Sequence, residues 1–229
     1  MEEGRGKREA KEGRGKRGEG SKRKKMSHMI EDLEGYFRNQ VPGRDELLLS
    51  LEEEAREEGI PIVGPVVGHL LYLLVRANQG RKVLELGTAS GYSAIFLGRA
   101  CRENGGRLVT LEWEPGMAER AKANLQRAEL STLAEVRVGS ALELMESMEG
   151  SYDLIFMDLD KEYYLPALSA CRRLLRPGGL LIVDNVGFRG AEPFNKKISS
   201  DPDWLSIPLL AFLPGHSPEQ DGLMVALRR

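Results

Sequence analysis

The spacing of the hydrophobic positions along this chain changes near residue 80. Before that point, apolar residues recur at helical intervals and predict helices from about residue 28, over residues 47–58 and from Pro65 onward. After it, short apolar runs alternate with amphipathic stretches. The runs predict strands at residues 83–86, 108–112, 136–138, 154–158 and 180–184, and the intervening helices are predicted to begin near Gly91, Pro115, Ser140 and Lys161. Alternation of this kind predicts an α/β fold, with a mostly parallel sheet and helices on both faces.

This alternation ends after Asn185. Residues 209–213 and 223–227 are predicted as two strands joined by a loop rich in proline, glycine and polar residues, and such a close return favours an antiparallel pair at one edge of the sheet. Residues 176–179, Arg-Pro-Gly-Gly, predict a sharp stop between a helix and the next strand. We therefore expect one folded domain over residues 26–229, with N-terminal helices over 26–80 and the α/β core over 81–229.

Charge divides the chain unevenly. Residues 1–25 carry eleven Lys/Arg and five Glu, a net charge of +6, whereas the remaining residues carry 22 basic and 30 acidic side chains, a net charge of −8. The first segment repeats EGRGKR at residues 3–8 and 12–17 and has almost no apolar residue, so we predict a disordered basic arm. The arm would either tether nucleic acid or be a solvated extension without a partner, and we favour the extension because charge runs are usually just solvated.

Composition narrows the class of protein further. The chain has 229 residues, 41% of them hydrophobic, which is enough for one sizeable core. Its two cysteines, Cys101 and Cys171, lie in separate helical patterns, which predicts free thiols in a reducing cytoplasm rather than a disulfide or a metal pair. No apolar run approaches the ~20 residues that span a bilayer, so we expect a cytoplasmic protein without a membrane partner.

The most informative segment is residues 82–97, KVLELGTASGYSAIFL, in which a buried strand leads into a helix through a glycine-rich loop. Gly87 and Gly91 let the backbone turn sharply and let a ligand approach the main chain. Their spacing is Glu-x-Gly-x-x-x-Gly, not the Gly-x-Gly-x-x-Gly expected for a dinucleotide. The loop therefore favours a nucleoside that bears an amino acid over NAD, although any turn between a strand and a helix remains an alternative.

Polar residues follow nearly every predicted strand, at the edge of the sheet where ligands bind in open parallel sheets. They are Glu85, Glu112, Ser140, Asp158 and the pair Asp184-Asn185. Glu112 follows Gly91 by 21 residues, a position suited to a carboxylate that accepts hydrogen bonds from both ribose hydroxyls. Trp113 would either pack on a flat base or belong to the core. Glu85 would contact the ligand or cap the glycine loop.

Asp158 and Asp184-Asn185 end two strands that one helix connects, so the strands are predicted neighbours. Two carboxylates and an amide oxygen would then converge, and such oxygen ligands suit a hard divalent ion, most naturally magnesium. The alternative for Asp184-Asn185 is a simple turn.

Lys161 follows Asp158 by three residues at a helix start, where a cation opposes the helix dipole. Near a metal ion and a positively charged cofactor this lysine would suit a general base. Its alternative is a surface lysine that pairs with Asp160 or Glu162.

Together these segments resemble one family. VLELGTASGYS, VTLEWEP, YDLIFMDLDKEYY, LLRPGG and LIVDN occur in the order found in metal-dependent class I O-methyltransferases, the family of catechol and caffeoyl-CoA O-methyltransferases and their microbial relatives. The resemblance covers about residues 45–229. It implies a Rossmann-like, seven-stranded sheet whose last strand is antiparallel, S-adenosylmethionine (SAM) as cofactor, a divalent cation and a homodimer.

The resemblance also implies roles for single residues. Cofactor contacts would come from Glu85, Gly87, Gly91 and Ser93 at the methionine end, Glu112 at the ribose, Ser140 and Trp113 at the adenine, and Asp158. Asp158, Asp184 and Asn185 would bind the metal ion, and Lys161 would be the catalytic base. Phe188 and Arg189 would line the mouth of the substrate site.

The family pattern is not complete in this chain. Ala89 replaces a glycine of the loop, the segment after Gly190 is short, and residues 213–221, LPGHSPEQD, are longer than the usual link to the last strand. No residue matches the acid that touches the second hydroxyl in the catechol enzymes, which puts catechol specificity in doubt.

We expect an enzyme that methylates a hydroxyl of a small vicinal-diol acceptor. The alternative is a methyltransferase acting on hydroxylated uridine in transfer RNA, which the basic arm favours and the acidic remainder opposes. A non-catalytic binding protein is disfavoured because the predicted metal ligands and Lys161 are all present.

Overall fold

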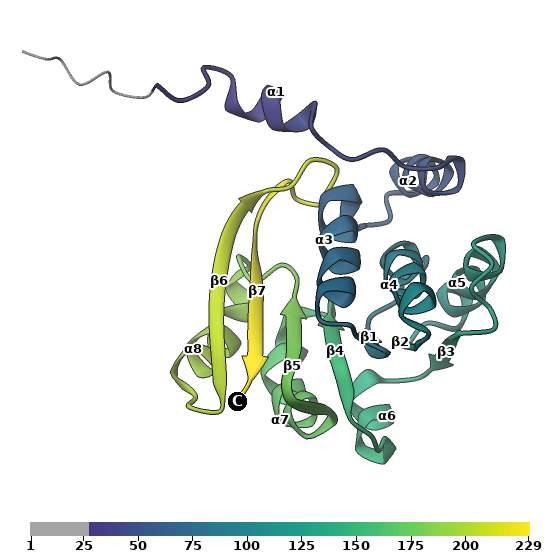
Figure 1. Ribbon diagram of the computed structural model, residues 1–229, viewed down its shortest axis with the longest axis vertical. Coiled ribbons are helices and arrows are strands. Elements are labelled where there is room, and N and C mark those ends of the chain that lie inside the picture. The colour runs from purple at the N-terminus through teal and green to yellow at the C-terminus, as the bar shows by residue number, and fades with distance from the viewer. Residues whose placement is uncertain (1–27) are drawn as a thin grey trace, which may run out of the picture.

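The computed structural model describes residues 28–229, so the predicted arm at residues 1–25 lies outside the described part of the chain. Seven strands form one sheet in the order β3-β2-β1-β4-β5-β7-β6 (Figure 1). The strands are β1 (Lys82–Leu86), β2 (Arg107–Glu112), β3 (Ala134–Val138), β4 (Tyr152–Met157), β5 (Leu175–Val183), β6 (Trp204–Phe212) and β7 (Gln220–Arg228). Only β7 runs against its neighbours, since it pairs antiparallel with both β5 and β6. The predicted mostly parallel α/β sheet with an antiparallel last strand is confirmed.

Helices cover both faces of this sheet (Figure 1). They are α1 (Leu33–Arg38), α2 (Glu46–Glu58), α3 (Gly64–Ala77), α4 (Tyr92–Asn104), α5 (Pro115–Arg127), α6 (Ala141–Ser147), α7 (Tyr164–Leu174) and α8 (Glu192–Ser200), with short 3₁₀ turns η1 (Lys161–Tyr163) and η2 (Arg189–Ala191). Helices α2 to α5 share one apolar core with the sheet, and α6 to α8 share a second core on the opposite face. The central strands are therefore buried on both sides, which explains why their sequences are continuously apolar.

Strand β4 shows how one apolar run serves both cores. Successive side chains of a strand point to opposite faces. Leu154 and Phe156 join the core beneath α2 to α5, whereas Ile155 and Met157 join the core beneath α6 to α8. All four side chains are fully buried. β4 pairs in parallel with β1 on one side and β5 on the other, so the order of connection reverses between β1 and β4. A crevice for ligands opens at such a reversal, outside the carboxyl ends of the strands.

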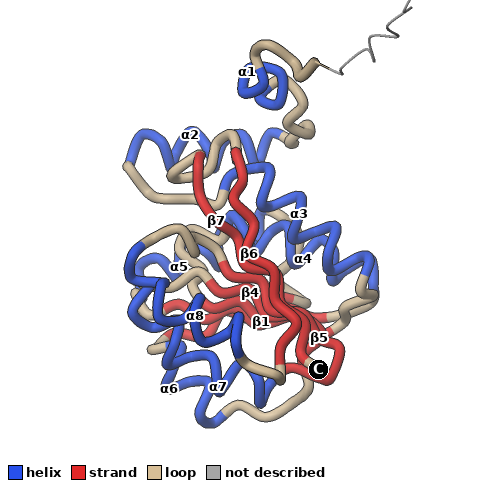
Figure 2. Tube along the Cα trace, turned by 90° about the vertical axis from the view of Figure 1, so that its left-hand side faces the viewer, coloured by secondary structure: helices blue, strands red, loops and turns tan. Residues whose placement is uncertain are grey.

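The N-terminal helices differ in how they attach. α2 and α3 contribute Leu51 and Leu71 to the core, whereas α1 has no buried residue and lies outside the main body in both views (Figure 1; Figure 2). α1 touches the hairpin of β6 and β7 through an ion pair between Arg38 and Glu219, with 2.6 Å between nitrogen and oxygen. No helix within residues 28–229 combines the length and apolarity needed to cross a membrane.

Two local predictions differ from the structure. The predicted stop at residues 176–179 is instead a bulge within β5, because Leu175 pairs with Tyr152 and the strand then resumes against Leu154 in a shifted register. Helix α8 lies in a segment where no helix was predicted. Its apolar face consists of few residues, chiefly the buried Phe194 and Ile198, and this is too weak a period to see in the sequence.

Candidate functional site

A cavity of about 770 Å³ opens at the carboxyl ends of β1, β2, β4 and β5. Most of the predicted site residues line it: Gly87, Ser93, Glu112, Trp113, Ser140, Asp158, Lys161, Asp184 and Asn185. Residues 59–63, between α2 and α3, form part of its wall, so the N-terminal helices help to enclose it. Its size and its mixture of apolar walls and a few polar groups are typical of a small-molecule site.

Four predicted residues lie elsewhere. Glu85 is fully buried beneath the cavity, and Gly91 lies at the start of α4 with a left-handed φ of 87°. Phe188 is half-exposed, and its ring centre lies 5.7 Å from the Nζ atom of Lys161. Arg189 begins η2 on the exposed side of the same segment. Phe188 thus stays close to the predicted base, whereas Arg189 does not line the cavity.

The glycine loop is pressed against the end of β4. Gly87 has a φ of 91°, and a side chain there would overlap the backbone carbonyl oxygen of Asp158. Only glycine meets both conditions without strain. The close approach places the loop directly beside Asp158, so the first and fourth strands contribute to one site.

Glu112 holds this loop in place. Its carboxylate accepts hydrogen bonds from the backbone N–H groups of Thr88 at 3.1 Å, Ala89 at 2.8 Å and Glu114 at 3.0 Å, and the residue is only 5% exposed. Trp113 lies beside it at the cavity with 73% of its surface exposed, so its alternative role as a core residue is wrong. The fold thus presents a fixed carboxylate and a free aromatic face side by side.

Glu85 is a fully buried acidic residue. Thr110 Oγ1 donates a hydrogen bond of 2.6 Å to its Oε2, while its buried Oε1 has no partner among the described residues. Burial is the main reason that the pKa of Glu85 is raised to about 8; hydrogen bonding by Ser93 and Thr110 lowers this pKa, and the charges of Asp158 and Glu112 raise it. An unpartnered buried acceptor next to the glycine loop suits a donor carried by a ligand.

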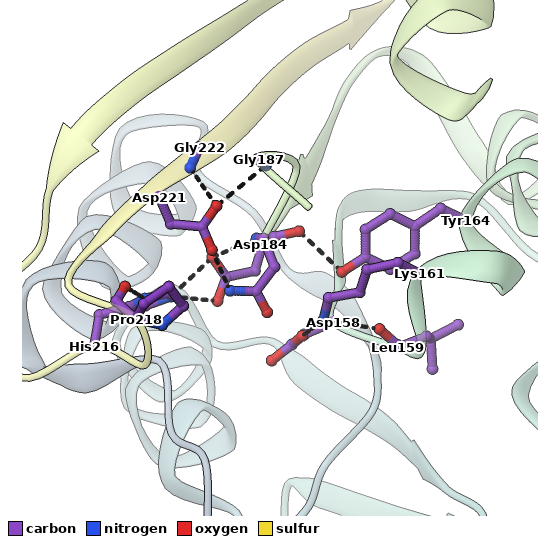
Figure 3. Close-up of polar contacts among 11 residues, drawn as sticks. Asp158, Leu159, Lys161, Tyr164, Asp184, Gly187, His216, Pro218, Asp221 and Gly222 are labelled. Carbon is purple, nitrogen blue, oxygen red and sulfur yellow. Dashed lines mark hydrogen bonds and ion pairs between the residues drawn. The ribbon is translucent and has the colours of Figure 1, made fainter. Parts of the chain in front are cut away.

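Lys161 is directed at the cavity rather than at the surface. Its Nζ donates to Asp158 Oδ1 at 3.2 Å and to the carbonyl oxygen of Leu159 at 3.0 Å, so the alternative pairing with Asp160 or Glu162 is wrong (Figure 3). Burial and repulsion by Asp184 together raise the pKa of Asp158 to about 6, against the lowering effect of Lys161. The lysine therefore stabilises the charged form of a carboxylate that its surroundings disfavour.

Asp184 and Asn185 are held by residues that the sequence analysis missed. His216 Nε2 lies 2.8 and 3.0 Å from the two carboxylate oxygens of Asp184, and Asp221 Oδ2 accepts a 2.7 Å hydrogen bond from Asn185 Nδ2 (Figure 3). His216 lies in the loop between β6 and β7, and Asp221 lies at the start of β7; both belong to residues 213–221, the segment that is longer than the family pattern. The extra length of this segment is the sequence feature that could have drawn attention to His216 and Asp221. A single histidine in a loop does not by itself reveal what it contacts.

Hydrogen bonding also orients these groups. Burial lowers the pKa of His216, but the hydrogen bond and charge of Asp184 outweigh burial and leave that pKa above its ordinary value. Asp221 accepts further hydrogen bonds from the backbone N–H groups of Gly187 and Gly222. Asn185 adopts a left-handed φ of 49°, which asparagine tolerates, so the predicted turn and the predicted site coincide.

The predicted metal ligands carry oxygen donors of the kind that a divalent cation takes. Within residues 28–229, no three His, Cys, Asp or Glu side chains are grouped in an arrangement that would hold an ion. The predicted set, however, joins the carboxylates of Asp158 and Asp184 to the amide oxygen of Asn185, whose nitrogen is occupied by Asp221. A cation bound between Asp158 and Asp184 would relieve the mutual repulsion of their carboxylates.

The following proteins, to which this chain is similar, are all described as O-methyltransferases. A family model described as O-methyltransferase matches residues 44–201. A catechol O-methyltransferase from Niastella koreensis is 40% identical over 167 residues, which span 70% of this chain and 72% of that protein. The O-methyltransferase TomG from Streptomyces achromogenes, solved in complex with SAM, has a TM-score of 0.76 and 31% identity over 87% of this chain and 99% of its own. An O-methyltransferase from Bacillus cereus, solved with SAH, has a TM-score of 0.77 and 30% identity over 86% of this chain and 96% of its own.

Proposed function

Because the chain belongs to the O-methyltransferase family and is a SAM-dependent O-methyltransferase, we propose that it methylates a hydroxyl of a small vicinal-diol acceptor with the help of a divalent cation. The single observation that carries this proposal is the group formed by Asp158, Lys161, Asp184 and Asn185 in one cavity with the glycine loop. The name of the Niastella relative supports a catechol-like acceptor.

Two ends of the cavity have separate tasks in this proposal. The cofactor end consists of the glycine loop, Glu112, Trp113 and Ser140, and Glu85 is buried outside the cavity lining. We assign the methionine part of SAM to the loop and Glu85, the ribose to Glu112, and the adenine to Trp113 and Ser140. The unpartnered Oε1 atom of Glu85 and the exposed face of Trp113 support these assignments.

The acceptor end consists of Asp158, Lys161, Asp184 and Asn185. We assign Asp158, Asp184 and Asn185 as the residues that would hold the cation. The chemistry that a divalent cation supplies at such a site is polarisation of a hydroxyl oxygen, which lowers the pKa of that hydroxyl.

Lys161 is the general base in this proposal. Asp158 and the Leu159 carbonyl hold its Nζ at the cavity, and the rings of Tyr164 and Phe188 lie 5.5 and 5.7 Å from that atom. From this position Lys161 would accept the proton of the acceptor hydroxyl while the fold holds the acceptor beside the methyl donor.

A transfer assay with matched acceptors tests the function. The chain is incubated with labelled SAM, Mg²⁺ or Mn²⁺, and catechol, resorcinol or total RNA. We expect label on catechol and little on resorcinol, whose hydroxyls are not adjacent and cannot share one ion. Equal labelling of both diols would contradict the vicinal-diol proposal, and labelling of RNA alone would favour the transfer-RNA alternative. Chelation should stop transfer while the circular dichroism of the apo protein persists, because two large cores hold the strands.

We also propose that the protein is a cytoplasmic homodimer. β6 is an edge strand of the described sheet, and Leu205, Ile207, Leu209 and Leu210 on it are exposed, Leu210 to 89%. An edge of this kind is normally covered. Light scattering at micromolar concentration should give twice the mass of the chain, and a monomer would contradict the proposal.

A further inference from the structure

A second cavity lies beside the acceptor end of the site described above. Its volume is about 460 Å³, and most of its walls come from apolar residues of β6 and of the segment that follows β5. Leu209 and Leu210 of β6 line it together with Val186 and Phe188. The reaction proposed above makes no use of this space.

Two segments of the chain pass from one cavity to the other. After β5, Asn185 lines the acceptor end, and the next residue, Val186, lines the second cavity. In the loop between β6 and β7, Ser217 lines the first cavity, and the next residue, Pro218, lines the second. The two cavities therefore adjoin along both segments.

The ring of Phe188 connects the second cavity with the proposed base. Phe188 lines that cavity, and its ring centre is 5.7 Å from the Nζ atom of Lys161, which lines the first cavity. An acceptor whose hydroxyl lies within hydrogen-bond reach of Lys161 would therefore place its ring close to Phe188. A substituent that extends from the acceptor past Phe188 would enter the second cavity.

The second cavity offers apolar contact but no cation. No Lys, Arg or His of residues 28–229 lines it, and the charged side chain at its wall is the carboxylate of Asp221. This carboxylate already accepts hydrogen bonds from Asn185 Nδ2 and from the backbone N–H groups of Gly187 and Gly222 (Figure 3). A negatively charged substituent would meet the Asp221 carboxylate without a compensating cation, which is unfavourable. The lining therefore favours an uncharged, apolar substituent.

We propose that the second cavity binds an apolar substituent of the acceptor, so that the preferred substrate is a vicinal diol that carries an uncharged alkyl or aryl chain. This inference rests on the proposed function, because it extends the acceptor that Lys161 would deprotonate. The substituent would cover Leu209 and Leu210, which are otherwise exposed at the edge strand. Each methylene group buried there should improve binding about three- to fourfold.

Matched diols test this preference in the full chain. We measure kcat/KM for 4-methylcatechol, for 4-butylcatechol and for 3-(3,4-dihydroxyphenyl)propanoate, whose chain is about as long as butyl but ends in a carboxylate. The butyl compound should exceed the methyl compound by about 10- to 40-fold, and the carboxylate should show no gain. Equal values for the methyl and butyl diols, or an equal gain with the carboxylate, would overturn the inference and leave the proposed function in place. Transfer to none of the diols would contradict the proposed function and this inference with it.

Two leucine variants locate the gain. In Leu209→Gln and Leu210→Gln we measure the ratio of kcat/KM for 4-butylcatechol to that for 4-methylcatechol, because the fraction of folded enzyme cancels in this ratio. The ratio should fall at least about threefold in both variants. Leu205→Gln is the matched control, since Leu205 is also an exposed leucine of β6 but does not line the cavity. A parental ratio in both cavity variants, or an equal fall in the control, would overturn the inference.

A second copy of the chain is the alternative occupant, because β6 is also the edge proposed for the subunit contact. Leu205 and Ile207 lie on β6 outside the cavity, so they remain available for that contact. Light scattering of Leu210→Gln should therefore give the parental mass. Half the parental mass together with an unchanged ratio would show that the cavity is a subunit contact, and would overturn the inference.

Discussion

At the cofactor end of the cavity, Glu112 is held by backbone N–H groups of the glycine loop and of its own strand end. At the acceptor end, Asp184 is held by the side chain of His216, which lies 32 residues further along the chain. The backbone contacts come with the fold itself, whereas the side-chain contact depends on one loop. We therefore expect changes in residues 213–221 to alter the acceptor end and to leave the cofactor end intact. Substitutions at four positions test this difference between the two ends.

The largest effect is expected at Lys161. Lys161→Met should lower turnover by about 10²–10⁴-fold, the usual contribution of a general base. SAM affinity should stay near the parental value, because Lys161 belongs to the acceptor end. The loss should be smaller with acceptors whose hydroxyl is already acidic.

Lys196→Met is the matched control for that experiment. Lys196 is an exposed lysine paired with Glu192, and such surface pairs contribute only about 0–1 kcal/mol. Its turnover should be parental. If Lys161→Met also kept parental turnover and the same basic limb of the pH–rate profile, Lys161 would not be the base.

The next effect is expected at Glu112. Glu112→Ala removes the acceptor of three backbone hydrogen bonds and the proposed ribose ligand. Loss of charged hydrogen bonds costs about 1.5–3 kcal/mol, so SAM should bind about 10- to 150-fold more weakly in titration calorimetry. Glu112→Gln retains one acceptor oxygen, so its SAM affinity should lie between those of the parent and the alanine variant. Unchanged affinity in the alanine variant would remove Glu112 from the cofactor site.

Asp221 tests whether the two ends are independent. Asp221→Ala leaves Asn185 Nδ2 and the backbone N–H groups of Gly187 and Gly222 without their buried acceptor. We expect about 1–3 kcal/mol of lost stability, seen as a melting temperature lower by several degrees. SAM affinity should be nearly parental. A parallel loss of SAM affinity would show that the two ends are coupled.

The effect expected at Glu85 depends on pH and disappears near pH 5. The pKa of Glu85 is about 8 in the folded protein against an ordinary value of 4.5, so the folded state binds the proton more tightly than the unfolded state. Stability is therefore lost as pH rises from about 4.5 to about 8. Glu85→Gln cannot ionise and should escape this loss.

Thermal unfolding without SAM checks the prediction for Glu85. The variant should melt close to the parent near pH 5 and clearly above it near pH 9, because only the parent loses stability as Glu85 ionises. A difference that is the same at both pH values would show that the carboxyl group of Glu85 does not titrate in this window.

The sequence predicted the polar residues at the strand ends of both regions, but it did not predict the side chains that hold Asp184 and Asn185 in place. The strand run at residues 83–86, the glycine loop and Glu112 were predictable because their pattern is local, and topology then brings the strand ends to one edge. His216 and Asp221 were not, since their contacts lie 32 and 36 residues away and depend on how the last hairpin sits. No local pattern specifies where the hairpin lies. Helix α8 was missed for a different reason, because its buried face consists of few residues.

The position of β7 in the sheet has a consequence for assembly. β7 follows β6 in the chain but lies between β5 and β6, and within residues 28–229 β6 pairs with no other strand. During synthesis β6 is therefore made before the strand to which it must attach. The sheet edge and the Asp221 contacts therefore both depend on β7. A chain cut off before β7 would lack the strand that joins β6 to the sheet and the carboxylate that orients Asn185.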